Sequence, residues 1–307
     1  MTLLSERPSP LTYISLLAAV LFWGASFAAT KLVLQEFTVP AYMFVRFAAA
    51  SALFIPLLLL RGVPHLSPKD HLRLLLVAAF EPGLYFLFET EGLNRTGAAD
   101  AALIIASIPV VVGLLSRLLL GERQSRRTVV GATLSIFGVA VIVYGSGTAT
   151  NSESSLLGNL LVVGAVVAAA LYMITARNLS GMVSTLHLTA FQIFYGALFF
   201  APLHFATASR MQWENVTPRS VGALLFLVFF ATLIAFLAYN RALRDITAAR
   251  AAVWLNGIPV VTAVTAWILL GERLGWHHLI GGGLVLAGVF YASKRARTAT
   301  ASPLPGR

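Results

Sequence analysis

A carboxylate beside a helix break is the first feature of this sequence that could take part in chemistry. Glu81 lies inside a long apolar run and is followed directly by Pro82 and Gly83. Proline removes a backbone donor and glycine loosens a helix, so Pro82 and Gly83 form a candidate hinge. Ionisable residues inside apolar segments are functional candidates by default. Glu81 is therefore either a ligand for an ammonium group or a proton, or a side chain bonded to a neighbouring helix at a structural kink.

Two further side chains extend this candidate site along the same helix. Tyr85 and Glu89 follow Glu81 at intervals of four residues, which places all three on one helix face. Arg46, in the preceding apolar run, is expected at the depth of Glu89 and Glu91. Two interpretations stand for Arg46: a structural ion pair, which makes its burial tolerable, and a cation that binds the carboxylate of a substrate.

Two prolines interrupt later apolar runs in the same way. Pro109 and Pro259 each follow small or polar residues, and the carbonyls they free could bind substrate or act as hinges. Shared structural kinking is the alternative. Trp254 and Asn256 precede Pro259 but have no like residues ahead of Pro109, and such asymmetry suits contact with one asymmetric molecule. Aromatic side chains complete the candidate substrate-binding set: Tyr172, Tyr239 and Trp23.

The sequence offers little for other chemistry. It contains no cysteine, which excludes disulfides, thiolate metal sites and cysteine nucleophiles. Walker, nucleophile-elbow and HExxH motifs are absent. His277 and His278 are adjacent without a carboxylate or cysteine at ligand spacing, and we expect them to be solvated loop residues. No cofactor or metal is expected, and the chain is not expected to be an enzyme.

Composition decides the class of protein that must hold these residues. Hydrophobic residues make up 58% of the 307 residues, charged residues only 11%, and the mean hydropathy is +0.83. A soluble domain is about 45–50% apolar and about 25% charged. The chain therefore needs a lipid bilayer as its partner. Its net charge of +10 resides in short loops without nucleic-acid motifs, so no nucleic-acid partner is expected.

Apolar runs of about 20 residues predict an all-α polytopic membrane protein. Ten such runs are found, at about 12–33, 40–60, 72–93, 99–120, 127–146, 156–177, 184–205, 220–241, 248–270 and 276–293. With a cytoplasmic N-terminus, 16 of the 22 basic residues lie on the inner side and 5 on the outer side. This split predicts that both termini are cytoplasmic and that the number of transmembrane helices is even.

An internal repeat organises the ten predicted helices. Residues 101–123 and 251–273 are identical at 11 of 23 positions, including a shared IPVV core and a shared LLGER end. Each copy carries five helices, and because five is odd the second copy must enter the membrane from the opposite side. Two inverted five-helix repeats are a transporter architecture, with the substrate site near the middle of the membrane. Repeated glycines in the fifth and tenth helices are expected to allow close helix packing: Gly131, Gly138, Gly281, Gly282, Gly283 and Gly288.

Several of these motifs resemble the EamA family of the drug/metabolite transporter superfamily. They are the runs WGASF at 23–27 and FVRF at 44–47, and the paired Ile-Pro and Gly-Glu-Arg signatures at 108–123 and 258–273. The chain looks most similar to YddG-type exporters of aromatic and other neutral amino acids. The resemblance implies a ten-helix carrier that moves small metabolites outward by alternating access.

The expected domain organisation is a tail at 1–10, a first EamA-like repeat at 11–146, a loop at 147–155, a second repeat at 156–293 and a tail at 294–307. A bacterial-type inner membrane is the expected location, and a monomer the simplest expected assembly. Cationic drugs remain an alternative cargo, and proton coupling an alternative to facilitated diffusion. Phosphorylated cargo would need two or more basic groups in the cavity, and only Arg46 lies well inside the membrane. A membrane enzyme or scaffold has no supporting motif.

Overall fold

The computed structural model describes residues 9–62, 64, 66–120, 126–148, 155–176, 184–245 and 254–293. Within these ranges every regular element is a helix. The predicted tail at 294–307, most of the tail at 1–10, most of the loop at 147–155 and the first Gly-Glu-Arg motif lie outside the described residues. The first half of the described chain comprises α1 Pro10–Leu34, α2 Val39–Arg61, α3 Pro68–Ala78, η1 Ala79–Leu84, α4 Tyr85–Leu93, α5 Ala98–Ile105, α6 Ile108–Leu120 and α7 Arg126–Thr148. The second half comprises α8 Leu156–Ala176, α9 Thr185–Ala206, η3 Ala208–Arg210, η4 Trp213–Asn215, α10 Pro218–Phe226, η5 Leu227–Ile234, α11 Ala235–Asp245, α13 Ile258–Leu270 and α14 Trp276–Ser293.

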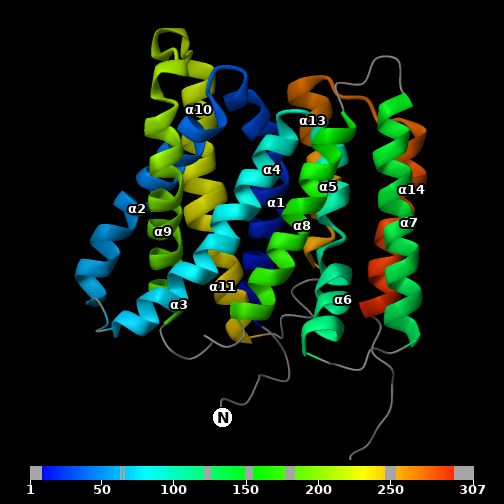
Figure 1. Cartoon of the computed structure of the whole chain (residues 1–307), viewed down its shortest axis with the longest axis horizontal. Helices are drawn as coiled ribbons and strands as arrows, with labels where there is room; N and C mark the ends of the chain where they lie inside the picture. Colours follow the sequence, from blue (N-terminus) through cyan, green and yellow to red (C-terminus); the bar gives the residue numbers. More distant parts are fainter. Residues whose placement is uncertain are drawn as a thin grey trace, which may run out of the picture.

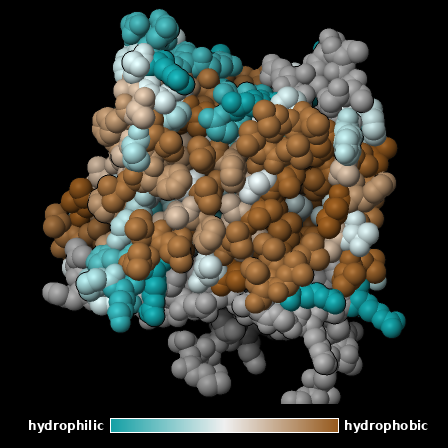
Figure 2. Space-filling model, viewed as in Figure 1, coloured by the Kyte–Doolittle hydropathy of each residue, from teal (hydrophilic) through white to brown (hydrophobic). Residues whose placement is uncertain are grey.

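Seven stretches of the described chain are long and apolar enough to cross a membrane. They are Pro10–Leu34, Val39–Arg61, Pro68–Leu93, Ala98–Leu119, Leu156–Thr175, Leu186–Ala206 and Pro218–Tyr239. Two shorter apolar helices, Val129–Gly145 and Ile258–Leu270, accompany them. Large apolar side chains cover the outside of the bundle as a broad belt between more polar ends (Figure 2). Such a belt suits lipid tails and confirms the membrane class, while the count of ten crossings stays a prediction.

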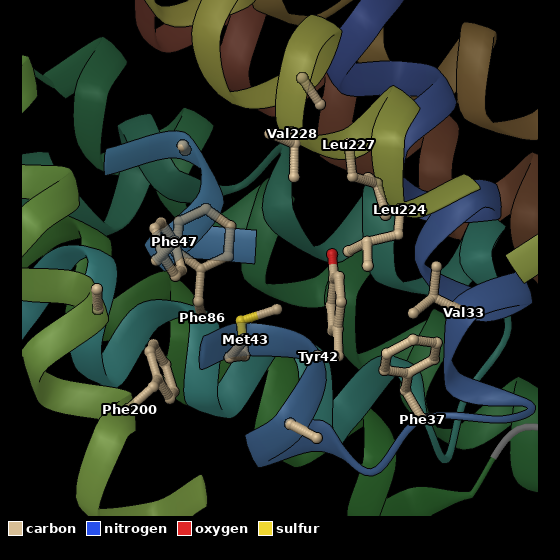
Figure 3. Close-up of a cluster of buried hydrophobic side chains, with 14 of the residues drawn as sticks. Val33, Phe37, Tyr42, Met43, Phe47, Phe86, Phe200, Leu224, Leu227 and Val228 are labelled. Carbon is tan, nitrogen blue, oxygen red and sulfur yellow. The ribbon is translucent and has the colours of Figure 1, made fainter. Parts of the chain in front are cut away.

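The helices form one bundle in which α7 and α14 pair at one edge and α2 packs on α9 toward the other (Figure 1). One apolar core lies between α2, α4, α9, α10 and η5 (Figure 3). Its largest fully buried side chains are Tyr42, Phe47, Phe54 and Phe200. A second core lies between α5, α8, α7 and α14.

Glycines hold α7 and α14 at close range, as predicted from the repeat. A Cβ atom on Gly138 would lie 2.6 Å from the carbonyl oxygen of Gly281, and one on Gly288 would lie 2.5 Å from that of Gly131. Neither distance leaves room for a side chain, so the two backbones touch directly. Gly283 differs from the prediction, because a Cβ there meets nothing within 4 Å.

Four helical runs are interrupted near their middle. The break at Glu81 is confirmed by its non-helical backbone, with φ −145° and ψ 115°. The predicted kink near Pro109 is a turn at 106–107, and the one near Pro259 is a turn at 256–257. The apolar run predicted at 220–241 corresponds to the candidate span Pro218–Tyr239, and within it the π-helical turn η5 replaces α-helix.

Candidate functional site

The helix break at η1 exposes a backbone carbonyl inside the bundle. Beyond Glu81 the chain runs through Pro82 and Gly83, both of which are buried. Gln192 of α9 donates its side-chain amide to the carbonyl oxygen of Glu81 at 2.9 Å. Gly196, one turn further along α9, faces Pro82 so closely that a side chain there would clash with the proline ring. The break is therefore a packed feature, stabilised from α9.

Polar and aromatic side chains from three helices gather around Glu81. The charge of Glu81 acts on the hydroxyl groups of Tyr172 in α8 and Tyr239 in α11. The ring of Trp23 in α1 lies 5.1 Å from that of Tyr239, centroid to centroid, and 5.3 Å from that of Phe236. The structure thus brings together Glu81, Tyr172, Tyr239 and Trp23, which lie far apart in the sequence.

Beside Glu81 lies a cavity of about 10 Å³. Its walls are Phe47, Glu81, Pro82, Phe86, Thr189, Gln192, Ile193 and Phe236. A cavity of this size holds roughly one water molecule. The space beside the carboxylate is therefore too small for an amino acid, and a larger ligand requires the walls to move apart.

Arg46 is buried near this cavity and is held by neutral partners. The Nε atom donates to the hydroxyl of Thr232 at 2.9 Å, and Nη1 donates to the hydroxyl of Tyr42 at 2.9 Å. Only 3% of the residue is exposed. The guanidinium carbon lies 5.0 Å from the centre of the Phe86 ring and 5.7 Å from that of Phe47. Arg46 is thus fixed in place with aromatic faces beside its charge.

The ion pair proposed for Arg46 from the sequence is not formed. Glu89 is buried and accepts a hydrogen bond from the hydroxyl of Thr90 at 3.1 Å. Arg46 acts on Glu89 only through its charge, since among the described residues no ion pair of 4.0 Å or less joins them. Glu91 instead pairs with Arg95, one turn further along the chain. Tyr85 lies near enough to Glu89 and Glu81 for both carboxylates to interact electrostatically with its hydroxyl group.

Two functional candidates in this network, Tyr42 and Thr232, were missed from the sequence. The hydroxyl of Tyr42 accepts a hydrogen bond from Arg46 and lies 2.9 Å from the hydroxyl of Thr30. Its spacing of four residues from Arg46 was the available signal. Thr232 had no such signal. Its hydroxyl donates to the carbonyl of Leu227 at 2.9 Å, five residues earlier, and so belongs to the wide turn η5.

The remaining predicted residues lie outside this group in the present conformation. Trp254 is 37% exposed, and its ring lies 5.8 Å from that of Tyr13 in α1. Asn256 is half-buried in the turn before α13, and Pro259 is buried at the start of that helix. Pro109 lies near the start of α6, the helix that follows the equivalent turn. Their roles as substrate contacts or hinges stay predictions.

The expectation for His277 and His278 is wrong. Both belong to the first turn of α14, and both imidazoles face Asp100 at the start of α5. The three side chains form a group that could hold a metal ion. No acidic partner was expected because Asp100 is about 180 residues away in the chain.

A second link joins the two halves at the same end of the bundle. Glu272, in the second Gly-Glu-Arg motif, accepts the backbone N–H groups of Ala98 and Ala99 at 2.9 and 3.3 Å. Its carboxylate also lies 3.5 Å from the ammonium of Lys31. A carboxylate at a helix N-terminus satisfies donors that the helix leaves open. The repeated motif therefore caps α5 from the far half of the chain.

Sequence comparison assigns this arrangement to a family. The profile of the EamA-like transporter family matches the chain twice, at residues 10–144 and 156–294. The chain belongs to this family. It is therefore a multi-pass membrane transporter for small molecules, not a member of an enzyme family.

Relatives of similar length support the same class. The "Uncharacterized transporter YetK" of Bacillus subtilis is 28% identical over 95% of this chain and 89% of its own length. An "Uncharacterized transporter" of Archaeoglobus fulgidus is 29% identical over 92% of this chain and 99% of its own length. The "Probable terminal-alkyne amino-acid exporter" of Streptantibioticus cattleyicolor is 26% identical over 92% of this chain and 93% of its own length.

A solved crystal structure shares the fold. It superposes with a TM-score of 0.65 at 20% sequence identity, covering 94% of this chain and 99% of the other. At this level of identity the likeness concerns architecture alone.

Proposed function

We propose that this transporter exports aromatic and other neutral amino acids by alternating access around Arg46 and Glu81. The observation that carries the proposal is the buried guanidinium of Arg46, which is oriented by Tyr42 and Thr232 and makes no close ion pair among the described residues. A buried charge is costly unless a partner compensates it. A substrate carboxylate is the partner that this geometry favours, because arginine binds carboxylates through two parallel hydrogen bonds.

The other groups of the site match the rest of an amino acid. Glu89 is buried and Glu81 is half-buried on the same helical run, and either carboxylate suits an α-ammonium group. Phe47, Phe86 and Phe236 line the cavity beside Glu81 and suit an apolar or aromatic side chain. A zwitterion with an apolar substituent thus meets a cation, an anion and a ring surface in one place.

The comparisons support this proposal at a coarser level. One relative is named as a probable exporter of a terminal-alkyne amino acid. The double match of the family profile supports an internal duplication, and the odd number of predicted helices in each half supports its inversion. The charge distribution of the loops supports cytoplasmic termini in a bacterial-type inner membrane.

Transport requires the closed cavity to open alternately toward each side. The breaks at Glu81, at 106–107, at η5 and at 256–257 lie in helices that border the two cores. Such discontinuities concentrate bending at a few residues, as in other carriers built from repeats. In this mechanism Pro82, Gly83, Pro109 and Pro259 mark the flexing points.

The test is uptake of radiolabelled phenylalanine, tryptophan and threonine into proteoliposomes that contain only this protein. We expect saturable flux, and loss of most of it in Arg46→Gln. Arg73→Gln is the matched control, because Arg73 is exposed and pairs only with Asp70 on its own helix. Absence of flux above empty liposomes with folded protein would refute amino-acid transport. Equal flux in both variants would remove Arg46 from the site.

Cationic drugs are the second candidate cargo. The observation that favours them is the presence of two carboxylates, the half-buried Glu81 and the buried Glu89, on a helical run with aromatic rings. Efflux of a fluorescent cation that is insensitive to Arg46→Gln but abolished by Glu89→Gln would favour this cargo. Proton coupling is tested with an imposed pH gradient: retention of substrate binding and of pH-dependent flux in Glu81→Gln would exclude Glu81 from coupling.

A further inference from the structure

A compact group of metal-ligating side chains lies away from the proposed substrate site. Asp100 belongs to the first turn of α5, and His277 and His278 belong to the first turn of α14. One ligand atom from each lies within 4.8 Å of the others. The group joins an element of the first half of the chain to one of the second half.

All three side chains are withdrawn from solvent. The exposed fraction is 2% for the side chain of Asp100, 6% for His277 and 10% for His278. The backbone of Gly145 in α7 packs against His277, where any larger residue would clash. Two imidazoles, with ring centres 4.0 Å apart and ring planes tilted by 36°, therefore share one buried carboxylate. Polar groups buried this way are expected to have a purpose that compensates their loss of water.

The distances fit a small divalent ion. His278 Nε2 lies 3.1 Å from Asp100 Oδ1, and His277 Nε2 lies 3.7 Å from the same oxygen. Ligands at about 2.0–2.1 Å from a tetrahedral Zn²⁺ are separated by about 3.3 Å. Small side-chain movements therefore suffice to place three ligands around one ion. Imidazole and carboxylate are ligands that Zn²⁺ accepts, and three protein ligands leave a fourth position for water.

Hydrogen bonding defines the starting state of the two imidazoles. Gly275 donates its backbone N–H to His278 Nδ1 at 2.8 Å, so a neutral His278 carries its proton on Nε2 and directs it at Asp100. Binding of an ion at Nε2 moves this proton to Nδ1 and breaks the bond to Gly275. His277 Nδ1 is buried and has no hydrogen-bond partner among the described residues. This second observation shows that one ring nitrogen of His277 is not occupied by a hydrogen bond among the described residues.

We propose that Asp100, His277 and His278 form a binding site for a divalent transition-metal ion of the Zn²⁺ type, which links the ends of α5 and α14. The site lies on the same end of the bundle as the cap that Glu272 places on α5. Because ion binding breaks the bond between Gly275 and His278, it acts on the segment at 271–275, which also carries Glu272.

The test measures Zn²⁺ binding to tag-free protein in detergent, by competition with a chromophoric chelator. We expect one ion per chain in the wild type. Asp100→Asn and His277→Gln should each weaken binding at least about 100-fold, beyond the 10–100-fold effect of an outer-shell partner. His187→Gln is the matched control, because His187 bonds Ser184 and the carbonyl of Gly62 away from this group. Binding that is equal in all variants, or absent from the wild type, overturns the proposal.

A second measurement does not depend on how the variants fold. X-ray absorption of the Zn²⁺-loaded wild type is expected to show a first shell of nitrogen and oxygen with the scattering pattern of two imidazoles. A shell with one imidazole or none overturns the proposal. Gel filtration of each variant, with and without the ion, checks that the loss of binding occurs in folded protein.

Discussion

The glycine contact between α7 and α14 gives the sharpest quantitative prediction, for Gly138→Ala. The added Cβ would lie 2.6 Å from the carbonyl oxygen of Gly281 and 2.7 Å from the backbone nitrogen of Val285. Both are backbone atoms of a continuous helix and cannot rotate away. The helices must therefore separate until the contact reaches an ordinary distance of 3.4 Å or more, a movement of about 0.8 Å.

The cost of this movement follows from the loss of contacts along the interface. When two packed surfaces move apart by 0.5–1 Å, each pair of contacting atoms loses about a quarter to a half of its dispersion energy. Overpacking of this kind destabilises by about 1–3 kcal/mol, and about 2–4 °C of melting temperature is lost per kcal/mol, so a fall of roughly 2–12 °C is expected. Alanine also favours the helix over glycine by about 1 kcal/mol, which partly offsets the clash.

The assay is thermal unfolding of the purified protein in detergent, followed by circular dichroism. Gly283→Ala is the matched control, since a Cβ at Gly283 meets nothing within 4 Å and gains the same helix propensity. The control is expected to melt at or above the wild-type temperature. Equal melting temperatures for Gly138→Ala and Gly283→Ala would refute the inference that the backbones touch at Gly138.

Three further predictions concern single side chains. Glu272→Gln should destabilise the capped start of α5 by about 0.5–2 kcal/mol, seen as faster amide exchange there and not in α10. Hydrogen bonds from the backbone and hydroxyl of Thr217 hold the pKa of Glu36 below its ordinary value of 4.5. The stabilisation by Glu36 is therefore complete above pH 4.5 and is lost as the pH falls through the lowered pKa, and Glu36→Gln should flatten this acid limb of a stability–pH curve. Thr232→Val removes the acceptor for the Nε atom of the buried arginine and should raise the KM for transport about tenfold, whereas Thr265→Val, which loses bonds only within its own helix, should leave the KM unchanged.

The sequence predicted those features of the fold whose causes are local. Proline and glycine dictate backbone geometry at their own positions, so the break at Glu81 and the turns before Pro109 and Pro259 were predictable. The close packing of α7 on α14 was predictable because small residues recur at the same repeat positions. Hydropathy identified the membrane class, since it depends on composition alone.

Features that depend on tertiary contacts could not be predicted. The wide turn η5 contains no proline or glycine, and its irregularity involves the Thr232 hydroxyl, which bonds both Leu227 and Arg46. The partners of Arg46 were predicted from depth in the membrane. Depth identifies acidic residues at the same level as Arg46, but it does not identify the neutral hydroxyls that lie nearer to its side chain. His277 and His278 were misjudged because Asp100 lies far from them in the sequence.

The small volume of the cavity beside Glu81 has a consequence for selectivity. Because the described residues beside Glu81 leave room for about one water molecule, the rings there must separate to admit cargo, and the space created then has to be filled. Unfilled volume in an apolar interior costs about 24 cal/mol per Å³, so cargo that leaves 100 Å³ empty loses about 2.4 kcal/mol, which is about a 50-fold preference. If the proposed site at Arg46 and Glu81 is correct, we therefore expect bulky substrates to be favoured over slender ones.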